Sequence, residues 1–456
     1  NEFPCASWLP VIYQNPTIVP SSWQELQDKF SDRKSVDEVL PQNKISSANF
    51  NSRFSSKFKF SKLLITAFTV FLSTIGLRYL QVFEIMELQT FDQMLQLRGK
   101  EEEDTRVVVV EVTEEDIQSL QEKTPGPQSI SDTTLAKLLS KLQEHKPRVI
   151  GLDIYRDFAE PINQLNKIQL PTELSKNNII VACKGKDEKY DPQGVKPPEG
   201  VPLVRHGFTD AIKDPDRIVR RQILRMRQEL SSPCKTPNSL SFQLVSGYLS
   251  YENIKPDVDR SDYIKFGDKI FQRLKSGRSG AYQQESLGGM QILVNYRNAD
   301  FPRISLKEVL NNDVNSDLFK DKVILIGVTA NTIGDTWYIP YSYPGQTDRE
   351  TPGVFIQAQM VSQILSSVSD NRPILWVLPS WGDIIWICGW SVVGSIIICR
   401  IRWYSHQIYA TVAMVVILYG VCAIALLNLG LWLPFIPSVF GVVAGGVVLS
   451  FIQSRR

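Results

Sequence analysis

The sequence predicts an α/β domain, built on a mostly parallel sheet with flanking helices, together with four transmembrane helices, one before the domain and three after it. Two observations predict this class. Uncharged apolar runs lie near both ends of the chain, and the polar stretch between them alternates strand-like and helix-like patterns. We therefore expect a multi-pass membrane protein with one large domain outside the bilayer.

The composition adds limits on function. The 456 residues carry a formal net charge of +2, and no basic patch with interleaved aromatic residues is present. Nucleic-acid binding is therefore not expected. The first residue is Asn rather than Met, so we expect a fragment or a processed product.

Three of the apolar runs follow the domain, at residues 374–399, 408–427 and 431–452. About twenty apolar residues cross the hydrocarbon core as a helix, so each run is long enough or nearly so. Gly441 and Gly445 in the last run favour a close approach of a neighbouring helix. Several indoles lie toward one end of the first run, as in an interfacial belt: Trp376, Trp381, Trp386 and Trp390.

The remaining apolar run precedes the domain, at residues 62–80. Its uncharged part, 63–77, is short, but snorkelling by Lys62 and Arg78 lets it reach across the bilayer. It lies too far from the first residue to be a signal peptide. We therefore predict a true span.

Basic residues set the topology. They cluster before the first span, between the second and third spans, and at the end of the chain, and four spans place all of these clusters on one side. By the positive-inside rule that side is the cytoplasm. Both ends of the chain are then cytoplasmic, and residues 81–372 lie outside a plasma (inner) membrane. The basic residues concerned are Lys44, Arg53, Lys57, Lys59, Lys62, Arg400, Arg402, Arg455 and Arg456.

The outer domain contains a strand–helix–strand pattern. Leucines at helical spacing lie between two strand-like runs, Ser131 or Asp132 is a natural N-cap, and Pro147 ends the helix. Such a unit predicts parallel strands covered on both faces. A last helix, 354–366, leads toward the second span. The strand-like runs are 107–112, 149–154, 179–182, 292–295 and 323–328.

Three acids mark a candidate site. In parallel sheets, ligands bind outside the carboxyl ends of the strands. Glu111 and Asp153 end two strands joined by one crossover, and Asp335, in the loop after the 323–328 run, could reach the same edge. Either these are satisfied structural carboxylates or they form a ligand or cation site. The acids at 114–116 have a simpler role, because Thr113 caps a helix whose first turn they occupy.

The sequence contains none of the common motifs for hydrolytic catalysis, metal binding or nucleotide binding. There is no GxSxG, HExxH, P-loop or GxGxxG after a strand, and the histidines lack metal-ligand spacing. We therefore expect no catalytic residues, no metal and no cofactor. Cys183 and Cys234 are the cysteines of the predicted outer domain, and they form either a disulfide or two independent thiols.

Several segments resemble the type-two CHASE domain, an extracellular sensory module of bacterial receptors that is common in cyanobacteria. The resemblance covers about residues 91–369, and it departs from the family pattern in KTPGPQSI (123–130), where a WPWPR-like stretch is usual. Members carry one span before the domain and three after it. The matching segments are FDQMLQLRG, VVVVEV with TEEDI, GLDI, GAYQQESLGGMQILVNYRN, KVILIGVTANTIGDTWYIP and TPGVFIQAQMVSQIL.

The resemblance implies a sensor that acts on a cytoplasmic effector. Such an effector would precede residue 1, and residues 1–26 resemble the tail of a caspase-like CHAT domain, with 27–61 as a cytoplasmic linker. The expected partners are the lipid bilayer, an unknown extracytoplasmic ligand, an effector in cis or in trans, and a second copy in a homodimer. The alternatives are an envelope docking or assembly protein and, less favoured, a membrane-anchored enzyme.

Overall fold

The computed structural model describes residues 65–454, except 67, 120–129, 159–167, 188–190, 276–278, 283–286 and 343–349. The expected effector tail at 1–26 and the linker at 27–61 lie outside the described residues. Residues 59–456 form one compact unit.

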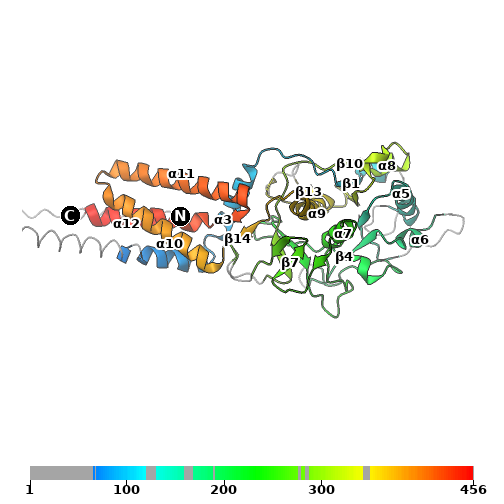
Figure 1. Ribbon diagram of the computed structural model, residues 1–456, viewed down its shortest axis with the longest axis horizontal. Helices are drawn as coiled ribbons and strands as arrows, with labels where there is room; N and C mark the ends of the chain where they lie inside the picture. The colour runs from blue at the N-terminus through cyan, green and yellow to red at the C-terminus, as the bar shows by residue number, and fades with distance from the viewer. Residues whose placement is uncertain are drawn as a thin grey trace, which may run out of the picture. The chain divides into compact units, whose positions relative to one another are not determined.

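A six-stranded parallel sheet is the centre of the α/β domain (Figure 1). Its order is β10-β1-β11-β2-β3-β4, and every neighbouring pair is parallel. The central strands are runs of Val, Ile and Leu because both of their faces are covered. This confirms the predicted parallel sheet with flanking helices. The strands are β1 (Val107–Val112), β2 (Val149–Asp153), β3 (Ile179–Cys183), β4 (His206–Phe208), β10 (Arg303–Ser305) and β11 (Val323–Val328).

Helices cover both faces of the sheet. Odd-numbered side chains of β1 and β11, such as Val107 and Leu325, share a core with α7 (Leu240–Ser250) and α9 (Gly353–Ser369). Even-numbered side chains, such as Val108, pack on the opposite group of helices. That group is α5 (Asp132–Glu144), α6 (Leu170–Leu174) and α8 (Leu306–Leu310).

Local capping explains where helices begin. Ser131 accepts a hydrogen bond from the backbone N–H of Thr134 and so caps α5. Thr113 and Asp116 exchange side-chain-to-backbone hydrogen bonds of 3.1 and 2.8 Å at the start of α4 (Glu114–Ser119). The acids that follow Thr113 therefore belong to the helix start, in the manner of a capping box.

Smaller sheets extend the domain on the α7 and α9 side. The predicted strand at 292–295 overlaps β9, which pairs antiparallel with β5 and does not join the parallel sheet. The remaining elements are β5 (Arg221–Arg225), β6 (Pro256–Asp257), β7 (Tyr263–Phe266), β8 (Lys269–Gln272), β9 (Met290–Leu293), β12 (Thr336–Trp337), β13 (Thr351–Pro352), β14 (Trp376–Val377), β15 (Leu431–Trp432), η1 (Leu203–Arg205) and η2 (Ser316–Leu318).

Apolar helices flank the domain in the sequence. Two of them, α10 (Ser380–Arg400) and α11 (Tyr404–Leu429), are long and apolar enough to cross a membrane, which supports a membrane protein. A third candidate is a bent pair, Phe68–Tyr79 followed by α3 (Glu84–Gln96) at 88°. The last helix, α12 (Phe435–Ser454), contains a shorter apolar stretch that ends at Val448.

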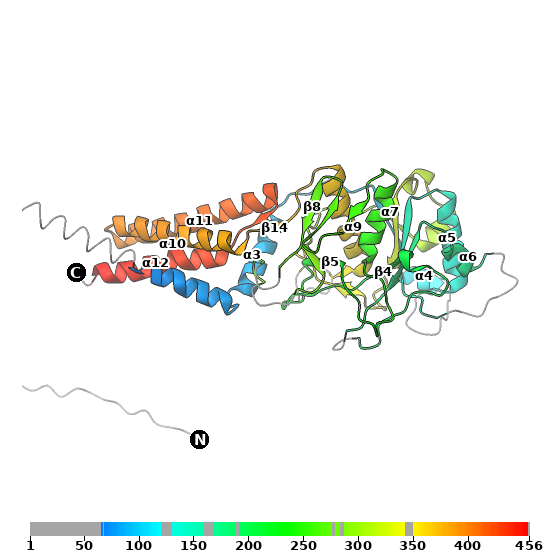
Figure 2. The ribbon, with the colours of Figure 1, turned by 60° about the horizontal axis from the view of Figure 1, so that its bottom comes forward.

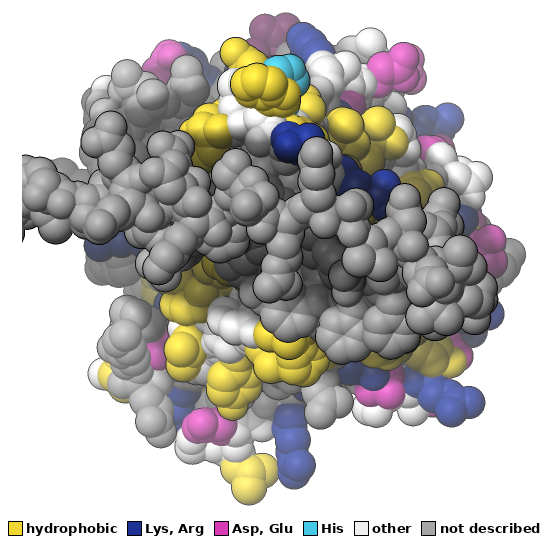
Figure 3. Space-filling model, turned by 90° about the vertical axis from the view of Figure 1, so that its left-hand side faces the viewer, with side chains coloured by type: hydrophobic (Ala, Val, Ile, Leu, Met, Phe, Trp, Pro, Cys, Tyr) yellow, Lys and Arg dark blue, Asp and Glu magenta, His cyan; other side chains and the backbone are white. Residues whose placement is uncertain are grey.

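α10 and α12 pack along a seam of small residues. A Cβ atom on Gly441 would lie 2.2 Å from Ser391 Oγ, and one on Gly445 would lie 2.8 Å from Ser395 Oγ. The glycines therefore allow the close approach that their spacing predicts. Figure 3 faces this end of the structure, where hydrophobic side chains gather with Lys and Arg among them.

The helix α3 lies between the apolar helices and the α/β domain (Figures 1 and 2). Its buried side chains Leu88 and Phe91 share a core with Leu418 and Leu426 of α11 and with Trp432 of β15. Glu87 accepts hydrogen bonds from the backbone N–H groups of the first residues of α12. The helix α3 is thus fixed against the ends of two apolar helices.

Candidate functional site at the carboxyl edge of the sheet

The predicted acids Glu111 and Asp153 lie in one row of the sheet. Both are paired in register with Gly327 of β11, the strand between theirs. Partners in such a row project to the same face, here the face covered by α7 and α9. Because each strand-to-strand step is about 4.8 Å, the Cα atoms of Glu111 and Asp153 are about 10 Å apart.

Gly327 allows α9 to begin at this edge. A Cβ atom at Gly327 would lie 2.5 Å from Cβ of Val354, in the first turn of α9. Only a residue without a side chain fits this contact. The acidic row and the start of α9 are therefore neighbours.

Asp335 reaches the same edge from the loop after β11. Its carbonyl oxygen accepts a hydrogen bond of 3.0 Å from the N–H of Gly353, the first residue of α9. Its carboxylate oxygen Oδ1 accepts one of 2.8 Å from Trp337 Nε1. A Cβ atom on Gly353 would lie 2.3 Å from the other carboxylate oxygen, so the Asp335 side chain lies directly against the helix start.

Asp153 and Asp335 influence each other electrostatically. Burial of the carboxylate and the negative charge of Asp335 together raise the pKa of Asp153 to about 8. Among the described residues, none donates a hydrogen bond or brings a positive charge that would lower the pKa of Asp153. Asp153 therefore holds a proton at neutral pH, and a proton, a cationic group or a hydrogen-bond donor would stabilise this edge.

Glu111 has a different environment. Its carboxylate oxygen Oε1 lies 3.7 Å from Nε of Arg303, which is on the neighbouring edge strand β10. Glu111 thus has a cationic partner, whereas none of the described residues provides one for Asp153. Of the three predicted acids, Asp153 and Asp335 act on each other, while Glu111 is paired with a neighbouring strand.

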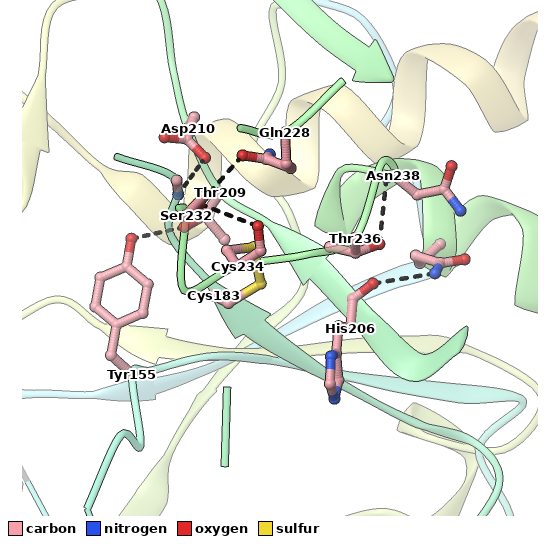
Figure 4. Close-up of a disulfide and its surroundings, with 12 residues drawn as sticks. Tyr155, Cys183, His206, Thr209, Asp210, Gln228, Ser232, Cys234, Thr236 and Asn238 are labelled. Carbon is pink, nitrogen blue, oxygen red and sulfur yellow. Dashed lines mark hydrogen bonds between the residues drawn. A yellow bond between two sulfur atoms is a disulfide. The ribbon is translucent and has the colours of Figure 1, made fainter. Parts of the chain in front are cut away.

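Further polar groups surround Asp153. The hydroxyl groups of Tyr155 and Thr209 share a hydrogen bond of 2.6 Å, and Asp210 accepts one of 3.1 Å from the N–H of Gly185 (Figure 4). Burial, followed by the negative charges of Asp153, Asp210 and Asp335, raises the pKa of Tyr155, which stays a neutral phenol. We define the acidic rim as Asp153, Tyr155, Asp210 and Asp335.

A disulfide lies beside this rim. Cys183, at the end of β3, is bonded to Cys234 with their Cα atoms 5.5 Å apart. The Thr209 N–H donates a hydrogen bond of 3.1 Å to the Cys183 carbonyl oxygen. Figure 4 shows the disulfide next to Thr209 and Asp210. The covalent bond therefore fixes the segment that carries part of the acidic rim.

The chemistry of the acidic rim suits hydrogen-bond donors and cationic groups. Among the residues that the structure describes, no group of three or more His, Cys, Asp or Glu is placed to hold a metal ion. The acidic rim offers carboxylates and a phenol, which bind hydrogen-bond donors and cationic groups.

A second polar cluster was not predicted from the sequence. Arg220 pairs bidentately with Asp92 of α3, at 2.8 and 2.6 Å, and also bonds Asp214 and Asp216. The side chains of Arg220, Asp92 and Asp214 are fully buried. The segment DPDRIVRR (214–221) contains the acids and arginines, but nothing local indicates that Asp92 is their partner.

Together these features describe an α/β domain with an acidic rim at the carboxyl edge of its sheet, joined by a buried ionic cluster to a helix that packs on apolar helices. This is the organisation of a membrane-attached sensory domain. A family model described as the CHASE2 domain matches residues 67–396, so the chain belongs to that family, whose domain is an extracellular sensory one. No curated protein and no solved structure matches the chain.

Proposed function

We propose that this protein is a membrane-bound sensor. Its α/β domain faces the extracytoplasmic side and detects a signal at the acidic rim, and four transmembrane helices (68–79, α10, α11 and α12) carry the response to a cytoplasmic effector. That effector lies upstream in the same chain or in a partner, and the sensor acts as a homodimer. Arg400 and Arg402 between α10 and α11 support this orientation, because basic loops stay in the cytoplasm. The proposal gives the acidic rim no catalytic role.

One observation carries the proposal: α9 connects the acidic rim to the membrane helices. Its first residue bonds to Asp335, and its 17 residues span about 25 Å. Its last residue, Ser369, is followed after a short connection by β14 and α10. A change at the rim therefore acts on one end of a helix whose other end leads into the membrane.

Polar contacts hold the far end of α9. Asp370 pairs with Arg106 at 2.6 Å, and Arg372 donates hydrogen bonds to Glu101 and to the backbone carbonyl of Asn295. Ion pairs and hydrogen bonds of this kind have discrete arrangements. A shift of α9 would therefore break these contacts and form a different set of ion pairs and hydrogen bonds. A ligand changes the balance between two such states only by binding one of them more tightly.

The test places a positive charge at the acidic rim. Full-length protein in phospholipid nanodiscs is compared with its Asp153→Lys variant by hydrogen–deuterium exchange and mass spectrometry. We expect altered exchange at the rim and also in residues 366–378, which begin about 20 Å from the first residue of α9. The control is Asp157→Lys, which places the same charge on an exposed side chain after the same strand.

Exchange that changes only at the rim would contradict transmission and would favour a docking or assembly protein. Thermal unfolding of each variant shows whether it is folded. If Asp153→Lys fails to fold, Asp335→Lys introduces the same charge at an exposed side chain.

A further inference from the structure

Large apolar side chains are exposed where the first apolar helix meets α3. Tyr79 and Leu80 are 66% and 67% exposed, and Val82, Ile85 and Met86 are about half exposed, at 55%, 49% and 53%. These residues are consecutive or one turn apart, so they form one patch. We call residues 79–86 with these exposed side chains the α3 apolar edge. Contiguous apolar patches on an otherwise polar surface mark interaction sites.

The orientation of α3 restricts what can cover this edge. The helix is bent by 88° from the helix Phe68–Tyr79. A helix perpendicular to a membrane span lies along the membrane surface. Figures 1 and 2 both show α3 crossing the ends of the apolar helices at the border with the α/β domain.

The opposite face of α3 is already occupied. Leu88, Phe91 and Leu95 are fully buried in the core shared with α11 and β15. Glu87 binds the first N–H groups of α12 at 2.9 and 2.7 Å, and Asp92 binds Arg220 of the α/β domain. These contacts fix the rotation of α3 about its own axis and keep the α3 apolar edge turned outward.

The exposed stripe of α3 changes character along the helix. Ile85 and Met86 lie in the first turn of α3, just after Val82, whereas Gln89 and Gln93 continue the same exposed stripe one and two turns later. Amphipathic helices at the lipid surface show this division between an apolar part in the lipid boundary and a polar part in water. Residues 82–93 follow this division, and the stripe becomes apolar again only at Leu97, after the end of α3.

Exposed indoles lie at the corresponding ends of the neighbouring helices. Trp381, in the first turn of α10, is 67% exposed, and Trp376 in β14 is partly exposed. Trp376 Nε1 donates a hydrogen bond of 3.1 Å to the carbonyl oxygen of Leu429, at the end of α11. Trp and Tyr collect at the boundary between lipid and water, so Tyr79, Trp376 and Trp381 indicate the level of the lipid headgroups.

We infer that the α3 apolar edge binds the outer lipid surface of the bilayer, with Val82, Ile85 and Met86 at the boundary between headgroups and acyl chains. The inference rests on the membrane orientation proposed above and adds a partner to it. Since α3 also binds the α/β domain through Asp92 and α12 through Glu87, the lipid surface then contacts the element that joins the two.

The test is site-specific photo-crosslinking in the full-length protein. A benzophenone amino acid replaces Ile85, Gln93 or Val416, one position at a time, in protein reconstituted into phosphatidylethanolamine–phosphatidylglycerol nanodiscs. Val416 is 65% exposed near the middle of α11 and is the positive control for lipid contact. Gln93 is the matched control on the exposed stripe of α3. Mass spectrometry then measures the lipid adduct at each position.

We expect the lipid adduct at Ile85 to approach that at Val416 and to exceed that at Gln93 several-fold. An adduct at Val416 with none at Ile85, or equal adducts at Ile85 and Gln93, would overturn this inference but leave the proposed membrane orientation intact. A protein–protein adduct at Ile85 would also overturn it, since the edge would then be covered by a second copy. No lipid adduct at Val416 would instead contradict the membrane placement of α11. Monodisperse elution and an intact disulfide show that each labelled protein is folded.

Discussion

Asp153 and Glu111 occupy the same row of the sheet but meet different surroundings. Glu111 lies near Arg303, whereas Asp153 faces Asp335 and the neutral phenol of Tyr155. Their positions at the ends of strands were predictable, because a buried strand that ends in an acid places it at the carboxyl edge. Their partners were not, because Arg303 and Asp335 are distant in the sequence.

The raised pKa of Asp153 predicts a pH-dependent stability. The ordinary pKa of Asp is about 3.9, so between about pH 4 and pH 8 the unfolded chain loses a proton that the folded protein keeps. Stability should therefore fall with rising pH across this interval, by at most about 1.4 kcal/mol per pH unit from this group. Asp153→Asn removes the titrating carboxyl, so the variant should exceed the wild type in melting temperature at pH 8.

Thermal unfolding of both proteins from pH 4 to pH 9 measures this effect. Asp335→Asn is a second check, because it removes the negative charge beside Asp153 and should lessen the decline near pH 8. Parallel curves for wild type and Asp153→Asn would contradict the assigned pKa.

At the scale of elements, the junction between β11 and α9 depends on close backbone approach. A methyl group at Gly327 would overlap Val354, so Gly327→Ala should push the start of α9 away from the sheet. Overpacking of this kind typically costs about 1–3 kcal/mol.

The melting temperature of Gly327→Ala in detergent measures this cost. Gly288→Ala is the matched control, because its added Cβ would have no described atom within 4 Å apart from those of its chain neighbours. Equal melting temperatures for the two variants would show that α9 does not rest on Gly327.

The link between α3 and the α/β domain makes a separate prediction. Arg220→Met leaves Asp92 without its bidentate partner, and breaking a buried pair typically costs about 3–5 kcal/mol. Arg227→Met removes an exposed guanidinium seven residues later in the sequence and should change stability little. Resistance to limited proteolysis between α3 and β1 measures the effect, and equal resistance in both variants would contradict it.

Regular elements were easier to predict than their long-range pairings. The run 107–112 coincides with β1, and the predicted last helix lies within α9, because hydrophobic periodicity and caps are local. β10 escaped prediction because it is only three residues long. The predicted strand at 292–295 overlaps β9 only in part. The residues of β9 alone do not indicate that it pairs antiparallel with β5.

At the scale of the whole molecule, the orientation in the membrane can be tested by labelling in intact cells. Asp259 is an exposed residue of the α/β domain, and Arg402 is exposed between α10 and α11. In a variant whose cysteines outside the disulfide are replaced by serine, a cysteine at Asp259 should react with a membrane-impermeant maleimide.

A cysteine at Arg402 should react only after the cells are permeabilised. This contrast follows from the basic residues around α10 and α11, which favour a cytoplasmic loop. Labelling of both positions in intact cells, or of Arg402 alone, would overturn the orientation.

The pairing of β14 with β15 has a mechanical consequence. β14 directly precedes α10 and β15 directly precedes α12, and their parallel ladder ties the two helices at one end. The Gly441–Ser391 and Gly445–Ser395 contacts hold the same helices together along their length. This ladder and these contacts oppose sliding of α10 past α12, and β15 directly follows the end of α11. A force delivered through α9 would therefore act on the outer ends of all three helices together.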